Sequence, residues 1–119
     1  MGYALKLIDP VTKETLHSAK PHHICGSTFV AGGTTECWFS ITYNYSEHLF
    51  RALGHKGIRC IYGLTGAESI EILRAGVDKL KDDDGSQNYW NPTEANTKRA
   101  LLSLIEMAEL RPDGVWAGD

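Results

Sequence analysis

The feature that most constrains the fold of this chain is a change of hydrophobic period between residues 36 and 54. In residues 36–43, apolar and polar side chains alternate with a period of two, which is typical of a half-buried strand. In residues 44–53 the apolar side chains follow at helical spacing, and Gly54 then provides a stop. The stretch therefore predicts a strand that runs directly into a helix, with mostly β-structure before this junction and mostly helices after it.

Three helices are expected from the junction onward, and each is predicted to begin at a capping box. In this motif the N-cap side chain accepts a hydrogen bond from an amide three residues later, and a glutamate at that position reaches back to the N-cap amide. Apolar stripes at helical spacing follow the second and third boxes, and Arg111-Pro112 ends the third helix. The three pairs are Asn44/Glu47, Thr65/Glu68 and Asn91/Glu94.

The residues before the junction are expected to form strands, turns and a loop. Residues 3–8 alternate and predict a first strand, which a turn at Asp9-Pro10 ends. Residues 15–19 are expected to return as a second strand and to form a hairpin with the first. Residues 21–35 are interpreted as a loop with one short strand around residues 28–30.

These elements predict a single α+β domain over residues 1–119, in which an N-terminal antiparallel sheet of three to four strands packs against three C-terminal helices. The strand at residues 36–43 is the most apolar and is expected at or near the centre of the sheet. Residues 58–62 predict a short strand or an extended segment on the core. Trp116 is expected to be pinned to the body of the protein, because a free tryptophan would leave a large apolar area in water.

The composition argues against several classes of partner. A formal net charge of -3 disfavours general nucleic-acid binding, which needs a basic surface to neutralise phosphates. No run of residues approaches the roughly 18 apolar residues of a membrane span, and the N-terminus lacks the apolar segment of a secretory signal. The three cysteines, Cys25, Cys37 and Cys60, lack CxxC spacing and are interpreted as reduced thiols of a cytoplasmic protein.

The sequence holds one group of soft metal ligands close together, at His17, His22, His23 and Cys25. A zinc site usually shows two paired half-sites, and this group supplies only one. No metal is therefore expected, and the histidines are interpreted as exposed loop residues.

No catalytic residue and no cofactor is predicted. The sequence contains no nucleophile elbow, no HExxH motif and no phosphate-cradling GxxxxGK[ST] loop. Ser46 stands two residues from His48, and Cys25 stands near His23, but sequence spacing does not establish an approach in three dimensions. A small hydrolase remains an alternative on these pairs alone.

Aromatic and arginine residues gather at or beside the expected helix starts. Helix N-termini attract anions, arginine clamps phosphate, and tyrosine or tryptophan stacks on bases. If these segments converge, they form a pocket for a nucleotide-like ligand; alternatively, the aromatic rings fill the interface between sheet and helices. The predicted ligand-binding residues are Tyr43, Tyr45, Arg59, Tyr89, Trp90, Asn96 and Arg99.

Five short motifs carry a resemblance that covers about residues 36–119. In chain order they are ITYNYS, GIR, GLTGAES, YWNPTEAN and RPDGVW, beginning at positions 41, 57, 63, 89 and 111. In this combination the chain resembles a family of small uncharacterised bacteriophage and bacterial proteins. The resemblance transfers no catalytic residue. It implies a context in which small phage-type proteins block host factors or capture the small signalling molecules of host defence.

The expected function is therefore non-enzymatic binding, in which a counter-defence protein captures a small nucleotide-like signal in the host cytoplasm. One alternative is a protein-interaction module that inhibits a host protein through an exposed apolar area centred on Trp38 or Trp116. The partner is accordingly a small molecule or a host protein. Self-association is expected in each case, because small binders often build pockets between copies and cyclic dimers are the commonest assembly.

Overall fold

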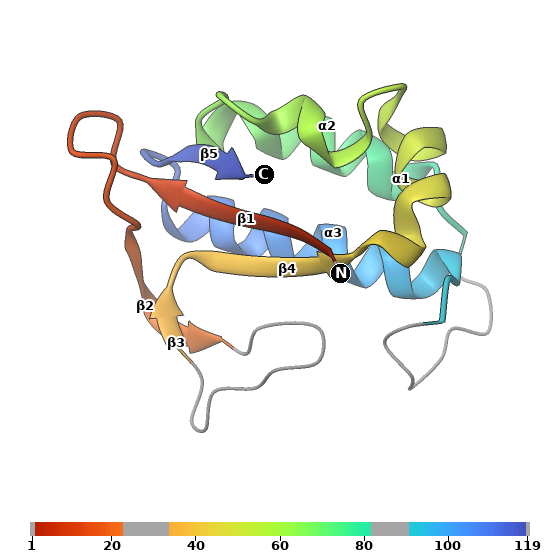
Figure 1. Ribbon diagram of the computed structural model, residues 1–119, viewed down its shortest axis with the longest axis horizontal. Helices are drawn as coiled ribbons and strands as arrows, with labels where there is room; N and C mark the ends of the chain where they lie inside the picture. Colours follow the sequence, from red (N-terminus) through yellow and green to blue (C-terminus); the bar gives the residue numbers. More distant parts are fainter. Residues whose placement is uncertain (1, 23–33, 82–90, 119) are drawn as a thin grey trace.

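The computed structural model describes residues 2–22, 34–81 and 91–118, which form a mixed α+β arrangement (Figure 1). The strands lie mostly in the N-terminal part and the helices in the C-terminal part, so the predicted fold class is confirmed. The strands are β1 (Gly2–Ile8), β2 (His17–His22), β3 (Thr34–Glu36), β4 (Trp38–Thr42) and β5 (Val115–Gly118), and the helices are α1 (Ser46–Leu53), α2 (Gly66–Asp78) and α3 (Glu94–Leu110), with short 3-10 helices η1 (Tyr43–Tyr45) and η2 (Gly57–Ile61).

The main sheet is antiparallel with the strand order β4-β1-β5. Its central strand is β1, and the apolar strand β4 lies at an edge, which corrects the expected position of residues 36–43. The reason is a long-range pairing: β5 returns from the C-terminus and pairs with the second edge of β1, with Leu7 opposite Trp116. The edge of β5 that faces away from β1 is held by backbone hydrogen bonds, because the Trp116 amide donates to the Leu64 carbonyl at 2.9 Å.

The predicted hairpin of the first two strands is replaced by a different pairing. β1 and the following segment share an isolated bridge between Ile8 and Thr15 and a hydrogen bond from the Leu16 amide to the Leu7 carbonyl at 2.9 Å. From His17 onward the chain leaves β1, and β2 pairs with β3 in a separate two-stranded sheet. The edge of β1 is taken by the chain from Cys37 onward, whose carbonyl accepts from the Leu7 amide at 2.9 Å. The second strand therefore turns away from β1. The short strand predicted around residues 28–30 lies outside the described residues.

The junction after β4 is less direct than the sequence predicts. Residues 43–45 form η1, whose N-cap Thr42 accepts a hydrogen bond from the Asn44 amide at 3.2 Å. The helix α1 begins only at Ser46, and its N-cap Tyr45 makes no side-chain capping bond. The predicted capping box at Asn44 is therefore wrong, because Thr42, two residues earlier, takes the capping role at η1.

Of the two other predicted capping boxes, the one at α2 is present and the one at α3 is not. At α2 the capping box is confirmed: the Thr65 hydroxyl accepts from the Glu68 amide at 3.1 Å, and the Glu68 carboxylate accepts from the Thr65 amide at 3.0 Å. At α3 the N-cap is Thr93, which accepts from the Asn96 amide at 3.0 Å, so the predicted box at residues 91 and 94 is wrong. Residues 58–61 belong to η2 and form no strand.

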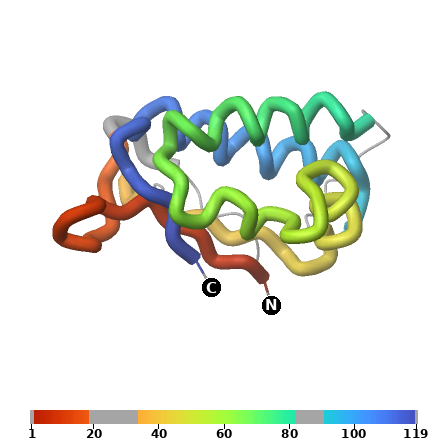
Figure 2. The backbone as a smooth tube through the Cα atoms, turned by 90° about the horizontal axis from the view of Figure 1, so that it is seen from above, coloured from red at the N-terminus to blue at the C-terminus, as the bar shows by residue number. Residues whose placement is uncertain are grey.

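The hydrophobic core lies between the main sheet and the helices. Alternate residues of β1 and β4, including Leu5, Leu7 and Ile41, are fully buried on one face of the sheet. In Figure 2, β1 and β4 run along one side of the molecule while α2 and α3 cover them from the other side. Trp116 is buried as expected, and its indole nitrogen donates to the Ser69 hydroxyl of α2 at 2.7 Å. No described helix covers the opposite face of the sheet.

Candidate functional site

Two of the predicted ligand-binding residues, Tyr43 and Arg59, meet at a third residue, Tyr3. The ring of Tyr43 packs edge-on against Tyr3 with 4.7 Å between ring centroids, and the Arg59 guanidinium lies 4.9 Å from the centre of the Tyr3 ring. The Tyr3 hydroxyl hydrogen bonds to the Ser46 hydroxyl at 2.7 Å. Tyr3 therefore contacts both the Tyr43 ring and the Arg59 cation, which holds the start of β1 against η1 and η2. Tyr45 is only 1% exposed and belongs to the core.

Asn96 and Arg99 also meet, on the first turns of α3. Asn96 is buried. Its side-chain nitrogen Nδ2 donates to the Asn91 carbonyl at 3.2 Å, and its side-chain oxygen Oδ1 accepts from the Arg99 guanidinium. These contacts tie the segment before α3 to the helix. Tyr89 and Trp90, the remaining predicted residues, lie outside the described residues.

A second polar network joins the same segment to α1. Arg51 forms an ion pair with Glu94 at 2.7 Å, and its guanidinium also lies 2.9 Å from Nδ1 of His48. Because Arg51 can only donate, Nδ1 accepts, and Nε2 of His48 then donates to the Pro92 carbonyl at 2.8 Å. Both ring nitrogens of His48 are used in this way. Ser46 is engaged with Tyr3, so Ser46 and His48 do not form a nucleophile–base pair.

The described residues supply no metal centre. No group of three or more His, Cys, Asp or Glu side chains gathers within the described ranges. Nδ1 of His17 hydrogen bonds to the Thr35 hydroxyl at 2.8 Å, while His23, Cys25 and the side chain of His22 lie outside those ranges. Burial raises the pKa of the Cys37 and Cys60 thiols above their usual value, which keeps both sulfurs protonated near neutral pH.

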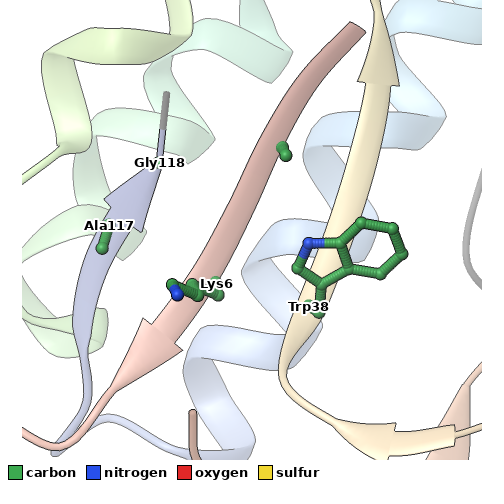
Figure 3. Close-up of a pocket in the computed structure, with 5 residues that line it drawn as sticks. Lys6, Trp38, Ala117 and Gly118 are labelled. Carbon is green, nitrogen blue, oxygen red and sulfur yellow. The ribbon is translucent and has the colours of Figure 1, made fainter. Parts of the chain in front are cut away.

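A pocket lies on the face of the main sheet opposite the core, with a volume of about 310 Å³. Its lining comes from all three strands, since Lys6 of β1 stands opposite Trp38 of β4 and Ala117 of β5. Strand alternation turns these side chains away from the core-facing Leu5 and Leu7. The hollow exists because the neighbouring positions are small. The lining residues are Ala4, Lys6, Trp38, Ala117 and Gly118 (Figure 3).

Two polar groups of this pocket are available to a ligand. The side chain of Lys6 is exposed and that of Trp38 is half-buried. Within the part of the chain that the structure describes, neither the Lys6 ammonium nor the Trp38 indole N–H has a hydrogen-bond or ion-pair partner. Trp116, by contrast, donates its indole N–H to Ser69. The pocket therefore combines an aromatic ring, a cation and an N–H donor, which together suit an aromatic anion.

Sequence reasoning missed this pocket. It considered Trp38 only as the centre of a protein-binding surface and did not single out Lys6. Alternation in residues 3–8 could have placed Lys6 on the outer face of a strand. The neighbouring Ala117 and Gly118 could not be found in this way, because nothing local predicts that β5 pairs with β1.

Comparisons with known proteins add no assignment, because the chain matches no protein-family model and no significantly similar curated protein or solved structure was found. Among the described helices, none is long and apolar enough to cross a membrane.

Proposed function

We propose that this protein binds a small nucleotide-like ligand, without converting it, in the pocket on the outer face of the main sheet. The observation that carries the proposal is the placement of Trp38 directly opposite Lys6 in one hollow. An indole ring offers a surface on which a base stacks, and a lysine ammonium offers a compact charge for a phosphate. In the phage-type context that the resemblance implies, such a protein acts by capturing a signalling nucleotide.

Binding without conversion is supported by the chemistry of the lining. Lys6 is the one ionisable side chain among the five lining residues, and a general acid–base mechanism needs groups that exchange a proton with the substrate in a defined geometry. Lys6 has no neighbouring base in this lining to prepare it as a nucleophile. The Ser46 and His48 pair, which motivated a hydrolase, is engaged elsewhere.

A protein-interaction module that inhibits a host protein is the second candidate, because Trp38 lies on a sheet face that no described helix covers. Trp116 is buried and cannot centre such a surface. Among the described residues, the exposed large apolar side chains come from separate elements: Val11 from a turn, Tyr43 from η1, Phe50 from α1, Ile72 from α2, and Leu102 and Leu110 from α3. The ligand pocket therefore has the stronger support.

The test is a thermal-shift screen with mono-, di- and cyclic nucleotides, followed by calorimetric titration of each hit. A ligand at a hundred times its Kd adds about 2.7 kcal/mol to the free energy of unfolding, which raises the Tm of a domain of this size by several degrees. Trp38→Leu removes the stacking ring and should abolish the shift. Lys79→Met, which removes an exposed lysine at the end of α2, should leave it unchanged.

Two results would speak against the proposal. One is that no nucleotide of the panel raises the Tm of the wild-type protein. That result would favour the protein-interaction module, and its partner would then be sought by pull-down from a host lysate. The other is a shift that survives in both Trp38→Leu and Lys6→Met, which places the ligand elsewhere. Light scattering on the same samples tests the proposed self-association, which predicts a mass above that of the monomer.

A further inference from the structure

Resting on the proposed function, we infer that the ligand is a single nucleotide with a terminal phosphate, held by the phosphate at Lys6 and the Trp38 indole N–H. Three features of the pocket point to this ligand: its two donors come from directly opposite residues, no carboxylate lines it, and it is small. Each feature constrains a different part of the ligand.

The register of β1 and β4 sets Lys6 and Trp38 directly opposite each other. The Leu7 amide donates to the Cys37 carbonyl, so the backbone of β1 is turned toward β4 at Leu7 and turned away from it at Lys6. The next pair along the ladder, Lys6 and Trp38, is then of the non-hydrogen-bonded type, in which the side chains lie closest together. Figure 3 shows the indole nitrogen of Trp38 on the edge of the ring that is turned toward β1, and the Lys6 ammonium on the side of its own side chain that is turned toward Ala117. Because a lysine ammonium sits on a flexible four-carbon chain, it can turn toward an acceptor that is bound at the indole N–H.

The charge of the lining selects an anion. No carboxylate lines the pocket, and the Lys6 ammonium has no ion-pair partner within the described ranges. A terminal phosphate has several acceptor oxygens and can bond to an ammonium and an N–H donor at once. The chain as a whole carries a net charge of -3, so one local cation suits one phosphate group better than a longer polyanion.

The size of the pocket limits the ligand to one nucleotide. Its volume of about 310 Å³ lies at the small end of the range for ligand pockets. It offers one aromatic ring, that of Trp38, and a floor of the small residues Ala4, Ala117 and Gly118. One base can stack there while its phosphate reaches Lys6. The second nucleotide of a dinucleotide would find no further ring or cation in this lining.

Isothermal titration with matched ligands tests the inference. The ligands are the four common nucleoside 5′-monophosphates, the corresponding nucleosides, a cyclic dinucleotide and inorganic phosphate. The variants are Lys6→Met, which removes the cation, and Trp38→Phe, which keeps a stacking ring but removes the N–H donor, with Lys79→Met as the control. Circular dichroism confirms that each variant is folded.

At least one monophosphate should bind about tenfold more tightly than its nucleoside, as expected for a charge-assisted hydrogen bond. Lys6→Met should remove that difference, Trp38→Phe should reduce it while nucleoside binding persists, and Lys79→Met should keep it. Inorganic phosphate should bind at least tenfold more weakly than the monophosphate, because it cannot stack on Trp38.

The outcomes separate this inference from the proposed function. If the cyclic dinucleotide binds tenfold more tightly than every monophosphate, or if nucleosides bind as well as monophosphates, the single-phosphate inference is overturned while nucleotide binding stands. If inorganic phosphate binds as tightly as the monophosphate, stacking contributes nothing and the inference is again overturned. If no nucleotide or nucleoside binds, the proposed function itself fails.

Discussion

The buried hydrogen bond from Trp116 to Ser69 should be a principal link between β5 and α2, and a double-mutant cycle can measure it. Trp116 is 1% exposed, Ser69 is fully buried, and their side chains meet at 2.7 Å. The Ser69 hydroxyl also donates to the Gly66 carbonyl at 2.8 Å. The cycle compares the wild type with Trp116→Phe, Ser69→Ala and the double variant.

The expected magnitudes follow from burial. Replacing a buried tryptophan by alanine costs about 3–5 kcal/mol, and the smaller change to phenylalanine should cost about 2 kcal/mol, including the lost bond. Ser69→Ala should cost about 1–2 kcal/mol, because it leaves the indole N–H of Trp116 buried without a partner. The double variant should cost about 1 kcal/mol less than the sum of the two single changes, since each removes the same bond.

The measurement is equilibrium urea unfolding followed by far-ultraviolet circular dichroism, which avoids the fluorescence change that loss of a tryptophan causes. The m-values of the four proteins should agree, so that differences in their free energies of unfolding report differences in stability. If the two single costs add to within about 0.3 kcal/mol, the side chains do not interact, and the proposed link between β5 and α2 is refuted.

Three further predictions concern the start of α2 and its surroundings. Thr65→Ala should lower the free energy of unfolding by about 1 kcal/mol in urea unfolding, because it removes the N-cap hydroxyl; an unchanged midpoint would contradict the capping box. Gly66→Ala should lower the free energy of unfolding by about 1–3 kcal/mol in the same assay. The reason is that a Cβ there would stand 2.7 Å from the Arg111 carbonyl oxygen and 3.1 Å from the Pro112 Cα. An unchanged free energy of unfolding would show that this close approach is absent. The backbone N–H of Thr65 lowers the pKa of Glu68 below its ordinary value of 4.5, so the stability that this carboxylate contributes is present above that pH and is lost as the pH falls below it. Glu68→Gln should therefore make the Tm less sensitive to acidification through this range, and an unchanged pH profile would contradict the assignment.

Local signals were sufficient for the fold class and for the start of α2. Alternation in residues 3–8 and 36–43 identified the strands β1 and β4, and the spacing of Thr65 and Glu68 identified a capping box that the structure contains. Such signals fail where two residues compete for one role. At the start of α1, Thr42 caps η1 ahead of Asn44, and at the start of α3, Thr93 replaces Asn91.

The predicted site was recovered only in fragments. Tyr43 and Arg59 come together, but at Tyr3, which was not among the predicted site residues because it lies in a strand forty positions before Tyr43. Asn96 and Arg99 come together because positions three apart share a helix face, as their spacing indicates. Tyr45 lies in η1 and is buried in the core, which residue type alone does not indicate.

By itself, the sequence determined the class of the fold and the faces of its main strands and helices, because these depend on neighbours within a few positions. The tertiary structure decided that β1 is central, that Trp116 is buried against Ser69, and that Lys6, Trp38 and Ala117 share one pocket. These outcomes depend on pairing between residues more than thirty, and in part more than a hundred, positions apart. Such pairing is set by how the whole core packs, and no local pattern of residues specifies it.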